Sequence, residues 1–478
     1  MKFEQLIKKI SYISAKKQND FEIKEISNNS KDCRHADTFA AIKGNVLDGH
    51  KYIEDAIKNG AKTIIHTEDI DYLDNINYIK VSDSRKITSE ISNILADFPA
   101  KKMTLVGVTG TNGKTTTASL IYFLIKEIFG SATNIGTDGA FVNGQRIETP
   151  NTTPNIFFIN KVLNESLKKN INRAVIEASS HGLDQNRLLG INFDYGVFTN
   201  LSAEHLDYHK TMDNYFAAKM KLFEVSKVKI ANFDDPYGRK SKELFDDVIT
   251  FGLNEGSDYR AYEVKKIGKT THFKVKDQDF TINSIADYEV YNSLAAITCL
   301  NQMGVDLKEI SENLIKFKGI PSRFQFIEND LGKNIVIDFA HTPVAFDSLF
   351  KTIPKDVKTY AVFGVNGDRN FEFRKSTGNV CAKNKVFAVL TTDDNKFDTY
   401  ENITSDVISG IEEFHGEYLK IENRKEAIKW AIKNADKGDY IVTLGKGEER
   451  FLKHHGNEKT YYNEYETILE ALREIWKS

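Results

Sequence analysis

The sequence predicts an α/β protein of three domains, and three observations lead to this prediction. The chain has 478 residues, too many for one hydrophobic core. Short apolar runs alternate with helical patterns near both ends of the chain. Between them, a glycine-rich turn joins an apolar run to a helical pattern. Hydrophobic residues at 40% and charged residues at 28% are typical of a globular protein with sizeable cores.

The first predicted domain, residues 1–98, is a small α/β unit. Strands are expected at 38–42, 63–66 and 78–81, and helices at 53–58 and 87–95. Polar turn residues gather at 27–31 and at Asp48-Gly49-His50, where turns are a commoner explanation than a ligand site. Pro99 follows the last helical pattern, so a boundary is expected near 99.

The central domain, residues 99–326, opens with a predicted phosphate site. The apolar run Met103–Val108 predicts a buried strand, and Thr115–Phe129 has helical spacing. Backbone N–H groups at a helix N-terminus attract phosphate, and Gly110 and Gly113 let the main chain approach it. Lys114 is then placed to reach the outer phosphates.

The match to the Walker pattern is incomplete. Val108 stands where that pattern has its first glycine, although Thr115 is placed to bind Mg²⁺. An ordinary turn of Gly, Thr and Asn is the alternative. The strand, the Gly-Lys-Thr-Thr sequence and the helix together favour a nucleoside triphosphate site.

Two further strands are predicted to end at the same edge of the central sheet. Residues 173–178 and 194–199 are apolar runs followed by polar segments, and ligands bind beyond the carboxyl ends of such strands. The candidate metal and catalytic side chains there are Glu177, His205, Asp207 and His209. Loop histidines that bond to neighbouring backbone groups are an equally good explanation of His205 and His209.

The rest of the central domain is predicted to contain a helix, a β-meander and a second helix. The helix at 214–223 places Lys219 near its packed face, where the residues alone favour a lysine that extends to the surface. Strand-like runs at 262–264, 271–275 and 280–283 predict the meander, and 287–300 predicts the second helix, which contains Asn292. A turn-rich connector at 319–324 places the next boundary near 326.

The last domain, residues 327–478, again alternates strands and helices. Strands are expected at 335–339, 359–363, 386–391 and 440–444, and a helix at 425–435, which predicts a mostly parallel, Rossmann-like sheet. Polar segments follow three of these strands, at 364–369, 393–396 and 445–449.

Composition excludes several classes of function. The net charge of −3 gives no general attraction to nucleic acid or to anionic membranes. No apolar run approaches about 18 residues, and lysines interrupt the N-terminus, so we expect a cytoplasmic protein without a membrane partner. Cys33, Cys299 and Cys381 lack the spacing of metal ligands.

Taken in order, these segments resemble the Mur ligases of peptidoglycan synthesis, most closely the MurE type, over nearly the whole chain. The segment Thr109–Thr116 is similar to the family's ATP loop. This resemblance explains why Val108 stands where the Walker pattern has a glycine. The ATP contacts that the resemblance implies are Gly110, Thr111, Asn112, Gly113, Lys114, Thr115, Thr116, Asn292, Arg323, Asp338 and His341.

The resemblance also implies a Mg²⁺ site and a modified lysine. The metal ligands would be Thr115, Glu177, His205 and Lys219, the last as a carbamate (N6-carboxylysine). A carbamate converts a cation into an anion whose oxygens can bind Mg²⁺, where an ammonium would repel it. The residues implied in catalysis are Lys114, Lys219, His205 and Arg323.

The nucleotide-sugar peptide is expected to contact the first two domains. The implied residues are Ser30, Asp48, Gly49, His50, Asn151, Thr152, Thr153, Ser179, Gln185 and Arg187. The sequence reads Asn29-Ser30-Lys31 where Asp-Ser-Arg is common in the family, which weakens Lys31 as a contact more than Ser30.

The last domain is expected to select the incoming amino acid. The implied contacts are Arg369, Asp394, Asn395, Lys396, Gly445 and Glu449. Members that use meso-diaminopimelate typically show Asp-Asn-Pro-Arg where this chain has Asp394-Asn395-Lys396-Phe397, and Lys396 could supply a point charge in place of the Arg. Glu448 replaces the usual His of Gly-Lys-Gly-His-Glu.

The resemblance implies an ATP-dependent, amide-forming ligase. ATP would phosphorylate the side-chain carboxylate of D-glutamate in UDP-N-acetylmuramoyl-L-alanyl-D-glutamate, and an amine would attack the acyl phosphate. Meso-diaminopimelate or a dicarboxylate analogue such as lanthionine is the first expectation for the amino acid, and L-lysine the second. A folylpolyglutamate synthetase-like ligase and a nucleotide switch without ligase chemistry are the alternatives. We expect a monomer that closes around its substrates, and the general base stays unassigned among His205, His209 and Asp207.

Overall fold

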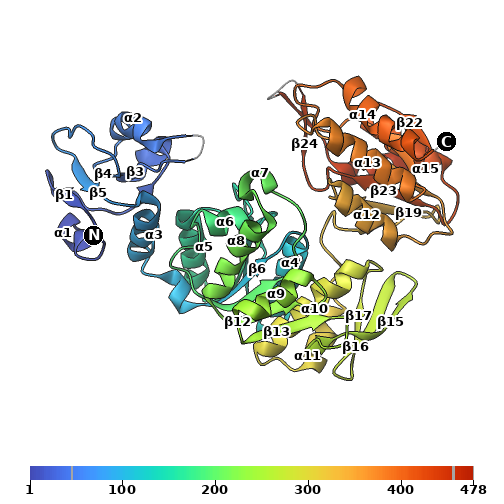
Figure 1. Ribbon diagram of the computed structural model, residues 1–478, viewed down its shortest axis with the longest axis horizontal. Helices are drawn as coiled ribbons and strands as arrows, with labels where there is room; N and C mark the ends of the chain where they lie inside the picture. Colours follow the sequence, from blue (N-terminus) through green and yellow to red (C-terminus); the bar gives the residue numbers. More distant parts are fainter. Residues whose placement is uncertain (45–46, 455–457, 477–478) are drawn as a thin grey trace. The chain divides into compact units, whose positions relative to one another are not determined.

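Mainly parallel β-sheets lie at the centre of each predicted domain, as the alternation of strands and helices indicated (Figure 1). The structure, a computed structural model, describes residues 1–44, 47–454 and 458–476. Its contacts divide the chain into two units. The first unit comprises residues 1–265, 272–282 and 290–317, and the second comprises 266–271, 283–289 and 318–478.

The N-terminal part of the first unit is a five-stranded sheet in the order β1-β5-β4-β3-β2, in which only β1 is antiparallel. The strands are β1 (Ser14–Lys16), β2 (Ile26–Ser27), β3 (Thr38–Ala40), β4 (Thr63–His66) and β5 (Asn77–Lys80). The helices are α1 (Phe3–Ile7), η1 (Ser30–Arg34), η2 (Gly49–Tyr52), α2 (Ile53–Lys58) and α3 (Ser84–Leu95). The three predicted strands and two predicted helices are all present.

Helix α3 joins this sheet to the central part of the same unit. The amide of Asn160 donates to Ser92 Oγ at 3.0 Å and to Asn93 Oδ1 at 2.9 Å. The predicted boundary near 99 falls directly after α3, at the start of the short helix η3 (Pro99–Lys102).

The central sheet has nine strands in the order β14-β13-β12-β11-β6-β10-β7-β8-β9. It is parallel from β14 to β7, and β8 and β9 are antiparallel. The strands are β6 (Thr104–Thr109), β7 (Thr133–Gly136), β8 (Gly139–Val142), β9 (Gln145–Ile147), β10 (Arg173–Glu177), β11 (Phe193–Phe198), β12 (Ser226–Asn232), β13 (Val248–Gly252) and β14 (Tyr259–Arg260). Because β6 lies inside the sheet, its residues are almost all buried, as its apolar run predicted.

Helices and a small meander complete the central region. The helices are α4 (Lys114–Phe129), α5 (Ile156–Lys168), α6 (Ser180–Asp184), α7 (Leu206–His209), α8 (Met212–Glu224), α9 (Pro236–Leu244), α10 (Asp287–Gln302) and α11 (Leu307–Leu314). The predicted meander is confirmed as β15 (Tyr262–Ile267), β16 (Thr270–Val275) and β17 (Gln278–Ile282). Its apolar side chains, Phe273 and Val275 among them, pack in one core with α4 and α10.

The second unit contains a six-stranded sheet in the order β18-β19-β23-β20-β21-β22, in which only β18 is antiparallel. The strands are β18 (Gln325–Ile327), β19 (Asn334–Asp338), β20 (Thr359–Phe363), β21 (Phe387–Leu390), β22 (Tyr418–Lys420) and β23 (Tyr440–Leu444). The helices are α12 (Pro343–Thr352), α13 (Phe371–Lys383), α14 (Tyr400–Glu413), α15 (Arg424–Asn434) and α16 (Glu464–Trp476). A hairpin of β24 (Phe451–His454) and β25 (Glu458–Tyr461) follows β23.

The boundary expected near 326 lies close to the start of the last segment of the second unit. The last segment of the second unit begins at residue 318, and residue 326 lies within β18. The connector therefore belongs to the C-terminal unit, because β18 pairs with β19.

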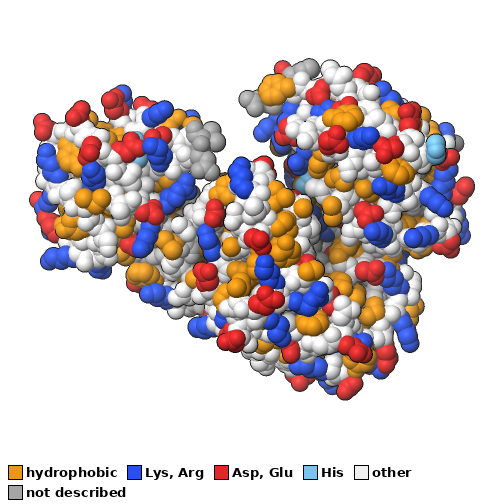
Figure 2. All heavy atoms as spheres, in the orientation of Figure 1, with side chains coloured by type: hydrophobic (Ala, Val, Ile, Leu, Met, Phe, Trp, Pro, Cys, Tyr) orange, Lys and Arg blue, Asp and Glu red, His pale blue; other side chains and the backbone are white. Residues whose placement is uncertain are grey.

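Surface charge agrees with the small net charge of the sequence. On the face shown in Figure 2, acidic and basic side chains are intermingled. In the described part of the chain, no helix combines the length and the apolar character needed to cross a bilayer.

Candidate functional site

The phosphate loop between β6 and α4 requires both of its predicted glycines. Gly110 and Gly113 have φ angles of 153° and 80°. A Cβ atom on Gly110 would lie 1.8 Å from Thr199 Oγ1, and one on Gly113 would lie 2.5 Å from Asn292 Oδ1. Asn292 also accepts a hydrogen bond from Thr117 Oγ1 at 3.2 Å, so α10 contacts the start of α4.

The segment after β11 holds the loop in place. This agrees with the prediction that the polar segments at the carboxyl ends of the parallel strands meet at one edge of the sheet. Asn200 accepts from the Asn112 backbone N–H and donates to the Asn112 carbonyl, both at 3.0 Å. Thr111 Oγ1 accepts from the Ser202 N–H at 3.0 Å. The Lys114 ammonium donates to the carbonyls of Gly110 at 3.0 Å and Thr111 at 2.7 Å, so the loop curves around it.

Glu177, at the end of β10, is fully buried beside the loop. Its carboxylate accepts from Thr115 Oγ1 at 3.0 Å, and from the N–H and hydroxyl of Thr137 at 3.0 and 3.1 Å. A Cβ atom on Gly136 would lie 2.0 Å from Glu177 Oε1, so that glycine makes room for the carboxylate.

These groups fit a magnesium site. Burial raises the pKa of Glu177, which the Thr137 hydrogen bond and the Lys114 charge partly offset. A carboxylate and a hydroxyl beside a phosphate loop are the hard oxygen ligands that Mg²⁺ prefers. Thr137 was missed from sequence, although it directly follows β7 and the carboxyl-end rule would have found it once β7 was recognised.

Lys219 is buried, with 1% of its surface exposed, which contradicts the expectation of a surface lysine. Its ammonium donates to the Gly110 carbonyl at 2.6 Å and lies 4.6 Å from the centre of the Tyr215 ring. Burial lowers the pKa of Lys219 well below its usual value, and the nearby Lys114 charge lowers it further. The neutral amine is thus more favoured at Lys219 than at an exposed lysine.

The histidines after β11 divide into an exposed one and a buried one. His205 is exposed in the left-handed conformation, with φ of 55°, and its ring lies 5.0 Å from that of His181. His209 is buried, bonds to Ser180 Oγ at 3.0 Å and stacks on Tyr215. The His205 side chain is 45% exposed, and the covered part of its ring and the burial of His209 lower the pKa of both histidines, which favours the neutral, ligating form. The exposed His205 is available to a ligand, whereas His209 has local partners.

Predicted peptide contacts gather on the other side of Glu177. Thr153 Oγ1 donates to the Glu177 carbonyl at 2.7 Å and accepts from the Ser179 N–H at 2.8 Å. Arg187 donates to the Thr153 carbonyl and to Gln185 Oε1, each at 2.8 Å. Thr152 Oγ1 lies 3.0 Å from Thr137 Oγ1, which links this loop to Glu177, and Asn151 is exposed beside it.

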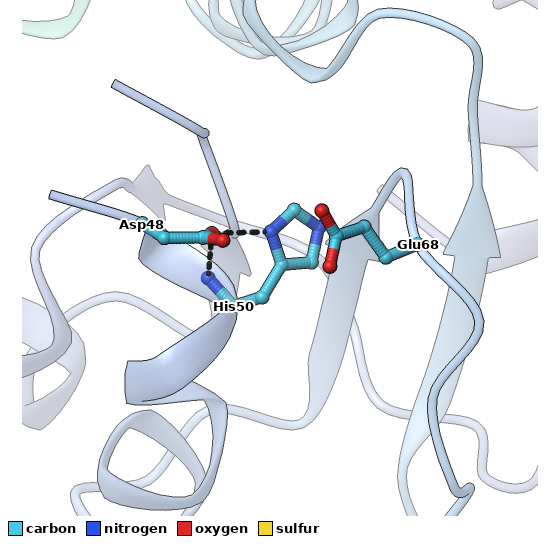
Figure 3. A group of neighbouring side chains, drawn as sticks. All are labelled: Asp48, His50 and Glu68. Carbon is cyan, nitrogen blue, oxygen red and sulfur yellow. Dashed lines mark hydrogen bonds and ion pairs between the residues drawn. The ribbon is translucent and has the colours of Figure 1, made fainter. Parts of the chain in front are cut away.

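In the N-terminal sheet region, Asp48, His50 and Glu68 form a close group (Figure 3). His50 Nδ1 lies 2.7 Å from Asp48 Oδ1, and His50 Nε2 accepts from the Thr67 N–H at 3.1 Å. Both ring nitrogens thus have partners, and Lys43 donates to Glu68 at 2.7 Å. The three side chains therefore already have hydrogen-bond or ion-pair partners within the protein.

Glycine 49 and Ser30 occupy tight turns of the same sheet. A Cβ atom on Gly49 would lie 2.6 Å from the Ile42 nitrogen, which excludes other residues there. Ser30 opens η1, and its carbonyl accepts from Asn59 Nδ2 at 3.1 Å. The Asn29 side chain caps this turn by accepting from the Lys31 N–H, also at 3.1 Å.

In the second unit, the connector and the end of β19 bring three predicted nucleotide contacts together. Buried Asp338 accepts from the backbone N–H groups of Phe324 and Ala340, each at 2.7 Å. The Arg323 guanidinium lies 4.8 Å from the centre of the Phe339 ring, and His341 Nδ1 lies 2.9 Å from the Phe339 carbonyl. Burial raises the pKa of Asp338, and Arg323 opposes that shift. Asp338 thus fixes the backbone on which Arg323 is presented.

The predicted amino-acid contacts lie at the ends of β20, β21 and β23. Gly367 donates its N–H to the Asp394 carbonyl at 2.9 Å, and Arg369 is exposed in the same turn. Gly445 has φ of 100°, and Asn395 is half-buried. Lys396 forms an ion pair with Asp368, and Phe397 is 90% exposed.

Sequence reasoning missed the buried lysine at the centre of this group. Lys446 is fully buried and donates to Asp394 Oδ1 at 2.8 Å and to Glu449 Oε2 at 2.7 Å. Burial alone would lower its pKa, but Asp393 and Glu449 outweigh that effect and raise it. Glu449, expected to meet the substrate, therefore already has a cation on one oxygen.

Family models match three successive parts of the chain. Residues 22–96 match a model described as "Mur ligase family, catalytic domain", 108–300 match "Mur ligase middle domain", and 322–447 match "Mur ligase, glutamate ligase domain". The three matches follow the three sheets in order.

Curated relatives are similar over the full length. A UDP-N-acetylmuramoyl-L-alanyl-D-glutamate–2,6-diaminopimelate ligase of Clostridium perfringens is 33% identical over 99% of both chains. A ligase of the same name from Clostridium acetobutylicum is 34% identical over 100% of both. A solved structure of a protein with this name covers 100% of both chains at a TM-score of 0.71 and 26% identity. A Thermotoga maritima MurF ligase in complex with ADP shares the fold at a TM-score of 0.63 and 24% identity, over 95% of this chain and 98% of that one.

Proposed function

The chain belongs to the Mur ligase family, and from this membership we propose that it joins a diamino acid to UDP-N-acetylmuramoyl-L-alanyl-D-glutamate with hydrolysis of ATP. The names of its full-length relatives favour 2,6-diaminopimelate as the amino acid. The observation that best supports this proposal is the arrangement of hydrogen bonds around Glu177. That carboxylate bonds to the phosphate loop through Thr115 and connects through Thr137 to the peptide-side loop at Thr152.

In this proposal the first unit carries out phosphoryl transfer to the side-chain carboxylate of D-glutamate. Backbone N–H groups of the loop and the Lys114 ammonium hold the phosphates, because positioning and charge neutralisation dominate such reactions. Thr115, Glu177 and His205 would hold Mg²⁺, whose charge would offset that of the phosphates. Arg323 is the positively charged nucleotide contact that we propose for the second unit.

We also propose that Lys219 carries a carbamate. Its amine favours the neutral form, which has the lone pair needed to attack CO₂. A nitrogen–carbon bond forms, one proton is released, and the lysine becomes an anion. The anion would attract the nearby Lys114 ammonium and offer oxygen ligands to the metal.

The second step is attack of a neutral amine on the acyl phosphate, after which phosphate leaves the tetrahedral intermediate. Arg369, at the end of β20, would hold the α-carboxylate of the amino acid through a charge-assisted hydrogen bond. Asn151, Thr152, Thr153, Ser179, Gln185 and Arg187 would hold the acceptor peptide, and Ser30, Asp48, Gly49 and His50 the uridine diphosphate. We propose a cytoplasmic monomer without a nucleic-acid or membrane partner.

Phosphate release by the purified protein tests this proposal. We expect release that requires ATP, the uridine-linked dipeptide and an amino acid together, with meso-diaminopimelate preferred over L-lysine. A nucleotide switch would release phosphate without the dipeptide, and a folylpolyglutamate synthetase-like ligase would need a folate instead. Either result would overturn the proposal, and a clear preference for L-lysine would overturn its choice of amino acid.

A further inference from the structure

Four side chains of the second unit form a row of alternating charges, which we name the charge chain: Glu449, Lys446, Asp394 and Lys453. The Lys446 ammonium lies 2.7 Å from Glu449 Oε2 and 2.8 Å from Asp394 Oδ1. The other Asp394 oxygen lies 3.0 Å from the Lys453 ammonium. The charge chain thus begins with an anion and ends with a cation.

The middle of the charge chain is buried and its ends are accessible. The side chains of Lys446 and Asp394 are 0% and 2% exposed, whereas those of Glu449 and Lys453 are 41% and 37% exposed. Lys446 and Asp394 each have charged partners on both sides, so neither is a free charge for a ligand. A ligand can reach only the carboxylate of Glu449 and the ammonium of Lys453.

The backbone fixes Lys453 in this place. Its N–H donates to Asp394 Oδ1 at 3.0 Å, and its carbonyl accepts from the Lys396 N–H at 3.3 Å. Lys396 also pairs with His454 in an isolated parallel bridge. Strand β24 is therefore attached to the loop after β21, which removes much of the conformational freedom of an exposed lysine.

Neither neighbouring residue of that loop offers a free positive charge. Phe397 is apolar and 90% exposed, and the Lys396 ammonium is paired with Asp368. Among the described residues Lys453 forms one ion pair, with Asp394, and because Lys446 shares that carboxylate, the charge of Lys453 is balanced less completely than that of Lys396.

We propose that the charge chain binds the distal amino-acid group of a diamino dicarboxylic acid: Glu449 accepts from its ammonium, and Lys453 donates to its carboxylate. This inference rests on the proposed function and names Lys453 as a specificity-determining residue of the amino-acid site. The distal ammonium would add a positive charge beside Glu449, and the distal carboxylate would add a negative charge beside Lys453. Both additions continue the alternation of charges and leave the buried ion pairs intact. L-Lysine has the ammonium but no carboxylate, so it leaves Lys453 without a substrate partner.

The test compares two lysines of one hairpin. Lys453 of β24 pairs in register with Lys459 of β25, which is exposed, so Lys459→Met is a matched control for Lys453→Met. The substrates are meso-diaminopimelate, its distal monoamide and L-lysine. For Lys453→Met we expect kcat/KM to fall about tenfold with meso-diaminopimelate, the effect of one charged hydrogen bond, and to change less than about twofold with the other two. Lys459→Met should leave all three values within that twofold range.

Two further variants separate binding from folding. Lys453→Arg keeps the charge and should keep most of the selectivity, while Glu449→Gln should weaken all three substrates, because each has a distal ammonium. Equal losses with the diacid and its monoamide, or no loss in Lys453→Met, would overturn the inference. Failure of the proposed function would give a different result. The wild-type protein would then release no dipeptide-dependent phosphate with any amino acid.

Discussion

Two lysines of this protein are equally buried but have opposite electrostatic surroundings. Lys219 is 1% exposed and Lys446 is 0% exposed. Lys219 donates to a backbone carbonyl and lies near the Lys114 charge, and its pKa is lowered far below the usual value. Lys446 lies among Asp393, Asp394 and Glu449, and its pKa is raised.

The difference shows that burial alone does not determine what a lysine does. Burial favours the neutral amine in both places, and only nearby carboxylates reverse that preference. At Lys219 burial and the Lys114 charge lower the pKa together, which agrees with the proposed role in chemistry. At Lys446 the outcome is a fixed cation that connects two loops, which agrees with a role in structure.

The largest expected effect is on stability, from Lys446→Met. Removing this cation takes away the ion-pair partner of the buried Asp393 and one of the two cations beside the buried Asp394, so the free energy of unfolding of the second unit should fall by about 3–5 kcal/mol. Urea unfolding at pH 7 measures this change. Lys429→Met is the control, because Lys429 forms an exposed pair with Glu474 and its loss should cost at most about 1 kcal/mol. Equal stabilities of the two variants would contradict the structural role of Lys446.

Lys219→Met should lower the ligase activity rather than the stability of the protein. Ligase turnover should fall by about 10²–10³-fold, the usual consequence of removing one preorganised electrostatic group. Stability should hold or rise, because no buried partner depends on a charge at Lys219. Phosphate release and thermal unfolding measure the two quantities. Lys221→Met on the same helix is the control, since Lys221 is partly exposed and pairs with Asp184; full activity of the Lys219 variant would refute the catalytic role.

The smallest expected effect is the pH dependence of the contribution that Lys446 makes to the stability of the protein. A lysine whose pKa is raised by folding stabilises the protein fully below its unfolded pKa, and this gain is lost as pH rises through the higher folded pKa. The Tm difference between wild type and Lys446→Met should therefore stay constant from pH 7 to about 10.5 and narrow above it. Thermal unfolding across this range checks the sign. A Tm difference that widens as pH rises would mean that Lys446 is not held as a cation.

Much of the fold could be predicted from periodicity, because parallel strands buried on both faces are continuous apolar runs. The strands at 63–66, 359–363 and 440–444 begin and end where predicted. The hairpins of β7–β9 and β24–β25 were not predicted. All of these strands are short, and β9 and β25 are rich in polar residues, so their pairing depends on neighbours that a local pattern does not contain.

The candidate site could be predicted where its chemistry follows a strand end. Glu177 and the phosphate loop belong to this class, and the structure brings them together. Lys219 could not be placed from its helix alone, because periodicity gives the direction of a side chain but not the depth of the site above it. Lys446 was missed for a related reason: two of its partners, Asp393 and Asp394, come from the loop after β21, which only the tertiary structure brings to Lys446 and Glu449 after β23.

The position of β6 inside the central sheet has a consequence for the order of folding during synthesis. Val106 pairs with Val175 on one side and with Tyr195 on the other, so the strand lacks both neighbours until both segments have emerged from the ribosome. The contact between Thr117 and Asn292 spans a further distance, 175 residues of chain. Contacts between residues so far apart in sequence form slowly. The phosphate loop lies early in the sequence, but its native surroundings are complete only when the central region has been synthesised.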